Sequence, residues 1–336
     1  MALTDRRSPA RLEGGAKPRL LVVIDTEEEF DWDRPLSRSN TATRSIAAQV
    51  RAQEIFAKHA VTPTYVIDFP VATDSAAAGL LREFAEDGRC VIGSHLHPWI
   101  NPPHDEAVTP VNSYPGNLER SLEKAKLEVL TESIAERFGA APTIYKAGRY
   151  GVGPRTAGIL EELGYRIDLS VVPYTSFTAD GGPDFRGFDF PPFWFGEADR
   201  LLEIPVTCGF CGALRSMGRG FFPWLSAPLG MSLHLPGIAS RLGLLERIRL
   251  SPEGAGFADL RRLADSLLEQ GCQVFSLTYH SPSLAPGHTP YVRDEHELEA
   301  FLETIERFLD YFIGAKGGEP TTPEALYADL ESARVR

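Results

Sequence analysis

The stretch Arg19-Leu20-Leu21-Val22-Val23-Ile24-Asp25-Thr26-Glu27 joins a continuous apolar run to two carboxylates. A short run rich in branched residues is typical of a strand that is buried on both faces, as in a parallel sheet. Asp25 and Glu27 are two residues apart, so their side chains point the same way in an extended chain. In parallel barrels the active groups lie at the carboxyl ends of the strands. The stretch therefore predicts a buried strand that delivers two carboxylates to a candidate site.

The rest of the chain alternates between short apolar runs and helical patterns. Further strand candidates lie at 64–67, 90–92, 143–146, 165–169, 201–206 and 273–279, and helical spacing lies at 41–59, 75–86, 117–138, 154–163, 257–270 and 294–312. Such alternation predicts an α/β fold with a parallel sheet. Seven strands favour a barrel over an open sheet.

The alternation also suggests boundaries along the chain. We expect a flexible N-terminal tail at 1–18, a single barrel at 19–318 and a C-terminal helical tail at 319–336. Residues 207–256 interrupt the alternation and predict a helical excursion over one end of the barrel. The excursion could be a lid over the site or a plain packing insertion.

Charge and composition narrow the partners. The formal net charge of −12 makes nucleic acid and anionic membrane surfaces poor partners. No apolar run is long enough for a transmembrane segment, and 1–18 lacks the apolar core of a signal peptide. Four cysteines are few for this length, which fits a reducing compartment and a cytoplasmic location. The isolated pair Cys208 and Cys211 is expected to be two ordinary reduced cysteines rather than a zinc site.

Two histidines follow the third apolar run. His95 and His97 are two residues apart, so both imidazoles could reach one ion. Three protein ligands and an open position for water are the pattern of a catalytic zinc site, and Glu27 could supply the third ligand. Taken separately, each of these features is common in ordinary loops and strand ends. Their shared position at strand ends predicts a metal site.

Three further residues could serve the same chemistry. His280 ends the last apolar run, and a histidine there could protonate a leaving amine. Arg149 could hold the Asp25 carboxylate through a bidentate bond, or form a salt bridge at the barrel rim. Asp168 could orient His280 or cap a turn.

These residues, in this order, resemble the motifs of the NodB-homology polysaccharide deacetylases, carbohydrate esterase family 4. The resemblance assigns Asp25 as catalytic base and Glu27 as metal ligand, one residue further along than the usual ligand. The motif with two metal-ligand histidines, the second followed by Pro, matches His95, His97 and Pro98 with a shorter spacing.

The later motifs of the family are matched less evenly. Arg149 matches the arginine motif, but Gly151 and Val152 replace the Pro and Tyr that normally follow. The motif aspartate that supports the acid histidine corresponds to Asp168, and the Leu-x-x-His motif ends at His280. His104 is the reserve ligand if His97 does not bind. The stretches 112–117, 146–152, 280–283 and 290–293 are similar to a WalW-like bacterial branch.

The resemblance spans 19–313 and implies a fold, an activity and a cofactor. The fold is a distorted (β/α)7 barrel, here with the excursion at 207–256. The activity is metal-dependent hydrolysis of non-peptide C–N bonds, in particular de-N-acetylation of an acetamido sugar in surface polysaccharide or lipopolysaccharide biosynthesis. The cofactor is a divalent metal, zinc first, with cobalt, manganese or nickel as alternatives.

Two other functions stay open. The chain could be a non-catalytic carbohydrate-binding or regulatory protein on the same barrel, or a hydrolase of a ureide or small amide. The substrate expected for a cytoplasmic enzyme is a nucleotide- or lipid-linked sugar. Aromatic residues at 185–195 and 221–224 could stack on sugar rings or fill the core.

Overall fold

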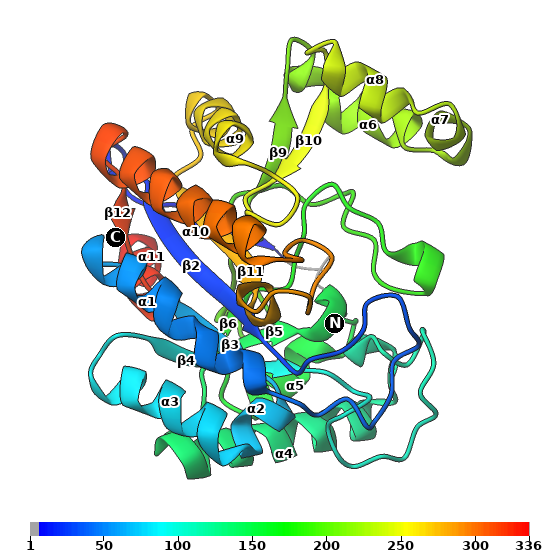
Figure 1. Ribbon diagram of the computed structural model, residues 1–336, viewed down its shortest axis with the longest axis vertical. Coiled ribbons are helices and arrows are strands. Elements are labelled where there is room, and N and C mark those ends of the chain that lie inside the picture. Colours follow the sequence, from blue (N-terminus) through cyan, green and yellow to red (C-terminus); the bar gives the residue numbers. More distant parts are fainter. Residues whose placement is uncertain (1–6, 336) are drawn as a thin grey trace.

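The computed structural model describes residues 7–335. Its centre is a curved sheet in which parallel strands lie side by side (Figure 1). In spatial order these strands are β8 (Leu201–Glu203), β6 (Ile167–Asp168), β5 (Ile144–Ala147), β4 (Val91–Leu96), β3 (Thr64–Ile67), β2 (Arg19–Thr26) and β11 (Val274–His280). All seven predicted strands are confirmed, and the α/β fold is a curled, incomplete barrel.

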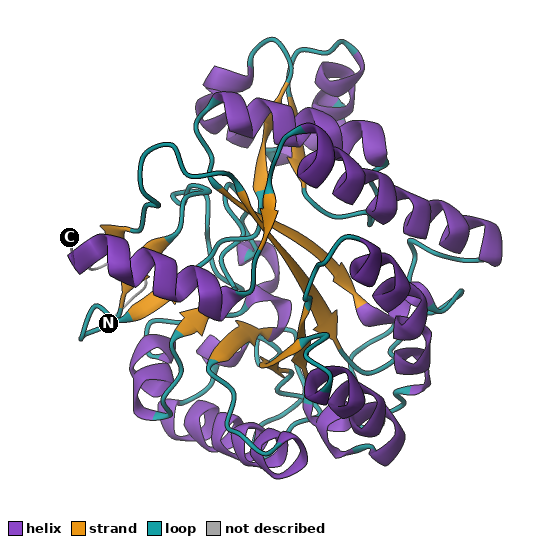
Figure 2. Cartoon of the chain, turned by 90° about the vertical axis from the view of Figure 1, so that its left-hand side faces the viewer, coloured by secondary structure: helices purple, strands orange, loops and turns teal. Residues whose placement is uncertain are grey.

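Helices cover the outer surface of this sheet (Figure 2). They are α1 (Gln49–Lys58), α2 (Phe69–Thr73), α3 (Ser75–Glu86), α4 (Arg120–Phe138), α5 (Thr156–Glu162), α9 (Phe257–Glu269) and α10 (Glu295–Leu309). Local sequence sets several helix ends. Asp74 accepts hydrogen bonds from two amides at the start of α3, Asp294 caps α10, and Gly139 ends α4 with φ 82°.

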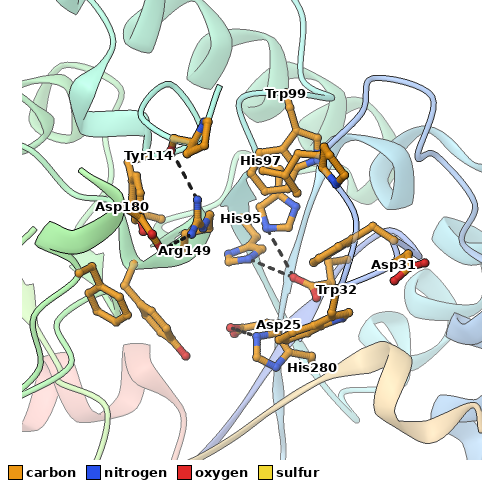
Figure 3. A pocket seen from close by; sticks show the side chains of 18 of the residues that line it. Asp25, Asp31, Trp32, His95, His97, Trp99, Tyr114, Arg149, Asp180 and His280 are labelled. Carbon is orange, nitrogen blue, oxygen red and sulfur yellow. Dashed lines mark hydrogen bonds and ion pairs between the residues drawn. The ribbon is translucent and has the colours of Figure 1, made fainter. Parts of the chain in front are cut away.

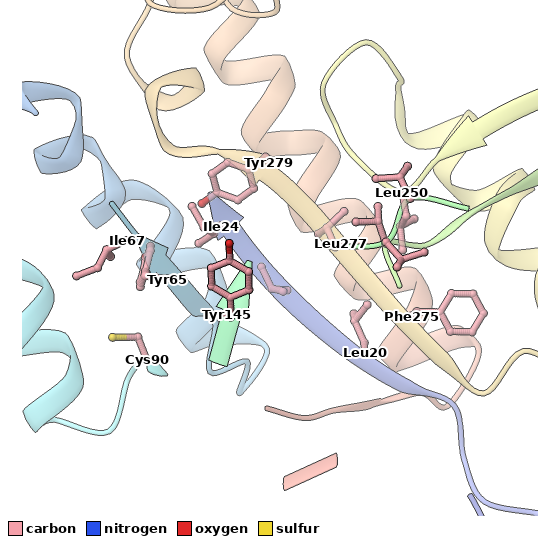
Figure 4. Close-up of a cluster of buried hydrophobic side chains, with 14 of the residues drawn as sticks. Leu20, Ile24, Tyr65, Ile67, Cys90, Tyr145, Leu250, Phe275, Leu277 and Tyr279 are labelled. Atoms are coloured by element: carbon pink, nitrogen blue, oxygen red, sulfur yellow. The ribbon is translucent and has the colours of Figure 1, made fainter. Parts of the chain in front are cut away.

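The two faces of the sheet carry different residues because side chains alternate along a strand. On β2, Leu20, Val22 and Ile24 belong to the large apolar layer between sheet and helices, part of which Figure 4 shows. Leu21 and Val23 face the barrel interior. There they pack with helix α11 (Pro323–Val335), whose Leu326 and Leu330 are buried in the same interior cluster.

The gap between the two outer parallel strands is bridged by single residues. The Thr207 carbonyl accepts a hydrogen bond from the Leu250 amide at 2.8 Å, and the Leu250 carbonyl accepts from the Thr278 amide at 3.0 Å. The Thr207 hydroxyl accepts from the Ser276 amide at 2.8 Å. These bonds join the segment after β8 to β11, so the curvature is held without a continuous ladder.

The two ends of the chain extend the sheet. β1 (Ser8–Pro9) pairs with β7 (Phe193–Phe195), which runs antiparallel to β8, and Ala10 is buried. The start of the chain was expected to be a flexible tail, but its described part pairs with the sheet through Ser8 and Pro9. The edge strand β7 offers free backbone groups for this pairing. Residues 1–6 lie outside the described residues. At the other end, β12 (Glu319–Pro320) pairs with β2 ahead of α11.

The predicted excursion is a helical arm on a two-stranded stem. The stem pairs β9 (Cys208–Cys211) with β10 (Glu246–Arg249) in antiparallel fashion. Between them lie α6 (Gly218–Leu225), α7 (Pro228–Ser232) and α8 (Leu235–Arg241), which contact one another and stand off the barrel (Figure 1). Among residues 7–335, no helix is long and apolar enough to cross a membrane.

Candidate active site

The alternation along β2 continues into the site. Leu21 and Val23 face the barrel interior, so Asp25 and Glu27 follow them on the same side. Strand register then places His280 of β11 beside Asp25, and Lys146 of β5 beside His95 of β4. The chemistry-bearing side chains therefore meet at the carboxyl end of the parallel strands.

These residues line a cavity of about 590 Å³ (Figure 3). Its floor includes Asp25, Glu27, His95, His97 and His280. Its walls are rich in aromatic side chains, namely Phe30, Trp32, Trp99, Tyr114, Tyr150, Phe177 and Tyr291. A polar floor under aromatic walls is suited to a ligand with both ring faces and polar groups.

Glu27, His95 and His97 form a compact group of possible metal ligands. Glu27 Oε2 lies 3.6 Å from His95 Nε2 and 3.5 Å from His97 Nε2. One ligand atom from each residue lies within 4.8 Å of the other two. The structure thus brings together all three residues that the sequence suggested.

Hydrogen bonds orient both imidazoles. His95 Nδ1 lies 2.9 Å from the Lys146 carbonyl, and His97 Nδ1 lies 2.8 Å from Glu28 Oε2. Both acceptors require a proton on Nδ1, which leaves each Nε2 lone pair directed at Glu27. A carboxylate behind a histidine is the usual support of a metal ligand. Trp99 Nε1 donates to the other Glu28 oxygen at 2.9 Å and holds that support in place.

The charge balance of this group favours a cation. Burial, together with Glu28, Asp25 and Asp68, raises the pKa of Glu27 well above its ordinary value. Burial lowers the pKa of His95 well below its ordinary value and that of His97 to about 4, so both rings are neutral, as ligands must be. Glu27 Oε1 is buried without a hydrogen-bond partner in the described chain. The donor set therefore fits a divalent ion such as zinc.

Gly148 allows the close packing behind His97. A Cβ at this position would lie 2.4 Å from the Leu96 carbonyl oxygen and 2.5 Å from His97 Cδ2. Any larger residue must push the imidazole or the end of β4 away. The glycine is therefore part of the geometry that places His97.

Asp25 is held by a lysine. Lys146 Nζ lies 2.5 Å from Asp25 Oδ1, and both side chains are almost fully buried. Burial alone raises the pKa of Asp25, but the positive charge of Lys146 is the largest opposing effect, and the pKa is brought to about 2. The sequence interpretation missed this partner, although a lysine inside an apolar strand is rarely buried unless it is paired.

His280 is held by a glutamate. Its Nδ1 lies 2.8 Å from Glu253 Oε2, and its backbone amide donates to Glu253 Oε1 at 2.9 Å. Its Nε2 faces Asp25 Oδ2 at 3.7 Å. Glu253 lies in the loop after β10, where no strand or helix pattern predicts the direction of a side chain, so its contact with His280 was not predicted.

Arg149 does not contact Asp25, contrary to one of the two interpretations offered above. Its guanidinium lies 3.2 Å from Asp180 and 2.5 Å from the Ser113 hydroxyl, and stacks over the Tyr114 ring at 4.4 Å. Its backbone is left-handed, with φ 53°. This turn directs the side chain away from Asp25 and onto the cavity wall. Lys146, not Arg149, lies beside the Asp25 carboxylate.

Asp168 does not reach His280. Its neighbours Ile167 and Leu169 belong to the interior cluster, so alternation turns Asp168 to the opposite face. There its Oδ1 accepts a hydrogen bond from the Ser170 hydroxyl. Burial raises its pKa to about 6, and burial and Asp168 together raise the pKa of Glu203 well above normal.

The remaining candidates lie outside the cavity floor. The reserve ligand His104 is exposed and is not among the described residues that could share an ion with Glu27. The aromatic residues at 185–195 mostly fill the core, as the alternative interpretation held, with Phe185, Phe188 and Phe195 buried. The described cysteines are all free and buried.

Within the described residues, the excursion lines the cavity only with its stem. Arg249, at the end of β10, is its lining residue among those described, and it donates to the Tyr150 hydroxyl at 3.0 Å. The helices α6, α7 and α8 do not line the cavity. The interpretation as a lid finds no support in this arrangement.

Comparisons with known proteins identify relatives by structure alone. No family model and no curated protein sequence matches the chain. Among solved structures, it is similar to a Mycobacterium smegmatis protein assigned as a polysaccharide deacetylase, with TM-score 0.57 and 14% identity over 97% of this chain and 94% of the other. It is also similar to Puue allantoinase, with TM-score 0.58 and 16% identity over 99% and 96%.

A Pseudomonas aeruginosa PAO1 protein assigned as a polysaccharide deacetylase gives TM-score 0.54 and 18% identity over 94% of this chain and 91% of the other. At these identities the similarity concerns the fold. The chain therefore has the α/β fold of the NodB type of polysaccharide deacetylase.

Proposed function

We propose that this protein is a metal-dependent hydrolase of non-peptide C–N bonds that removes the acetyl group from an acetamido sugar. The observation that carries the proposal is the pairing of two groups across one cavity. Glu27, His95 and His97 form one group, and Asp25 with His280 forms the other. The aromatic walls support a saccharide, because sugar rings stack on such side chains.

Glu27, His95 and His97 would hold a divalent ion, which would supply Lewis acidity to water and to a carbonyl. Asp25 is the general base that takes the proton of the attacking water. Its pKa of about 2 keeps it ionised at working pH, and Lys146 fixes its position. His280 then gives a proton to the departing amine, while Glu253 fixes its ring through Nδ1.

In this proposal Arg149 binds substrate on the cavity wall rather than holding the base, and Asp168 has a structural role. Zinc is the proposed metal, with cobalt, manganese or nickel as alternatives. The proposed substrate is a nucleotide- or lipid-linked sugar of surface polysaccharide or lipopolysaccharide biosynthesis, hydrolysed in the cytoplasm. The free cysteines agree with a reducing compartment.

A ureide or small-amide hydrolase is the second candidate. It is favoured by the similarity to Puue allantoinase, which covers nearly the whole of both chains. The same base, acid and ligands would serve either reaction, so the occupant of the cavity decides between them.

The test is acetate release from a panel of free, nucleotide-linked and lipid-linked acetamido sugars, with allantoin and simple amides as the competing substrates. We expect acetate from at least one sugar, loss of the activity with a chelator and recovery with zinc. Hydrolysis confined to the ureides would favour the second candidate. Metal binding without hydrolysis of any amide would support a non-catalytic carbohydrate-binding protein.

A further inference from the structure

The helical arm, residues 212–245, exposes apolar side chains far beyond what packing requires. Of the thirteen large apolar residues exposed in the described chain, ten lie in this segment. The most exposed are Trp224, Leu229 and Leu242, at 67%, 73% and 65%. Single exposed apolar residues are common, but a concentration of them on one small element marks a contact surface.

This exposure is not a failure of the arm to form a core. Phe210, Ala239 and Leu245 make a small buried cluster, against which Phe222 and Leu225 pack. The inward faces of α6 and α8 are thus already used. The outward apolar residues are left for an external partner.

The charge of the arm differs from that of the rest of the molecule. The chain has a net charge of −12, yet 204–245 contains no Asp or Glu. Arg215 and Arg219 pair with Glu269 and Asp189 at 2.8 and 3.6 Å near the barrel, and Arg241 is exposed on α8. The arm itself therefore presents no acidic side chain to an anionic surface.

From this combination we infer that the arm docks on an anionic lipid surface. Outward-facing Trp and Leu together with arginine as the charged residue are features of interfacial membrane binding. A self-association through the same face would place the exposed Arg241 of two copies in one interface without an acidic partner from the arm, which their like charge disfavours. This inference goes beyond the proposed function and does not depend on it.

The inference is tested by sedimentation of the full chain with vesicles of phosphatidylcholine, alone or with about one quarter phosphatidylglycerol. The test variant carries Trp224→Ser, Leu229→Ser and Leu242→Ser, and the matched control carries Val50→Ser and Val111→Ser, which are exposed elsewhere at 43% and 50%. All five side chains lie at the surface, so both variants should unfold at the wild-type temperature.

We expect the wild-type chain to bind the anionic vesicles, the test variant to partition at least about tenfold less, and the control to be unchanged. Arg241→Glu should weaken binding to the anionic vesicles more than to the neutral ones.

The inference is overturned if the wild-type chain stays in solution at about 1 mM lipid. It is overturned equally if light scattering finds a dimer that the test variant dissociates, because the face then serves a second copy. Acetate release plays no part in this test, so its result is separate from that of the proposed function.

Discussion

Asp25 on β2 and Asp168 on β6 are both buried carboxylates at the carboxyl ends of parallel strands, but their surroundings differ. Asp25 faces the barrel interior beside Lys146, and its pKa is lowered to about 2. Asp168 faces the opposite side near Glu203, and burial raises its pKa to about 6. The carboxyl end of a strand therefore does not by itself determine the role of a carboxylate. The face of the sheet to which the side chain points, and the charge of its neighbour, decide its pKa and whether it lies in the cavity.

The largest expected effect comes from exchanging each aspartate for asparagine. Asp25→Asn removes the proposed base and should lower kcat/KM by about 10²–10⁴-fold. Asp168→Asn, on the other face, should leave kcat/KM within about twofold. Steady-state acetate release measures both, and circular dichroism verifies folding. Equal losses of kcat/KM in the two variants would contradict the assignment of a catalytic role to Asp25 and a structural role to Asp168.

The second prediction concerns the carboxylate behind His97. Glu28→Gln keeps the size of the side chain but removes the charge that holds the imidazole through Nδ1. Loss of such a partner typically weakens metal binding by about 10–100-fold. Competition with a chromophoric chelator measures the zinc affinity. An unchanged affinity would mean that Glu28 does not support the ligand.

The third prediction follows from the lysine that distinguishes Asp25. Lys146→Met removes the nearest positive charge while burial of Asp25 remains, so the pKa of Asp25 must rise. The base then loses its charge at a higher pH, and the acidic limb of the kcat/KM profile should move up by at least about one pH unit. Arg149→Met is the control, since its guanidinium pairs with Asp180 instead. A shift in the control but not in Lys146→Met would reverse the assignment.

The last prediction is on stability and concerns the other strand end. The pKa of Asp168 rises from 3.8 to about 6 on folding, so the native state holds a proton that the unfolded chain releases. This contribution is full below about pH 4 and is lost as the pH rises through about 6, at a cost of about 3 kcal/mol. Asp168→Asn should therefore reduce the fall in unfolding free energy between pH 4 and pH 7. Urea unfolding at the two pH values measures this difference. A parallel fall in both proteins would contradict the raised pKa of Asp168.

Much of this comparison was accessible from the sequence. The seven parallel strands and the convergence of Asp25, Glu27, His95, His97 and His280 follow from apolar runs that end in polar residues. The face on which Asp168 lies was also accessible, because the apolar residues on either side of it mark the interior face.

The rest depended on three-dimensional placement. Glu253 comes from a loop, where no periodic pattern fixes direction, and its contact with His280 exists only because the stem of the arm returns to the barrel. The interpretation in which Arg149 holds Asp25 does not agree with the structure because a left-handed turn, which a motif match does not show, redirects its side chain. In a regular strand, the alternation of side chains between the two faces allows the direction of each side chain to be predicted from its position in the sequence. In a loop no such alternation exists.

The central claim is that Glu27, His95 and His97 bind one divalent ion, and anomalous diffraction from crystals grown with zinc tests it most directly. The claim predicts a single strong peak about 2.0–2.2 Å from a Glu27 oxygen and from Nε2 of both histidines. A neighbouring set, Glu28, Asp68 and His97, could also hold an ion. A peak at that set instead, or no peak at either, would contradict the account.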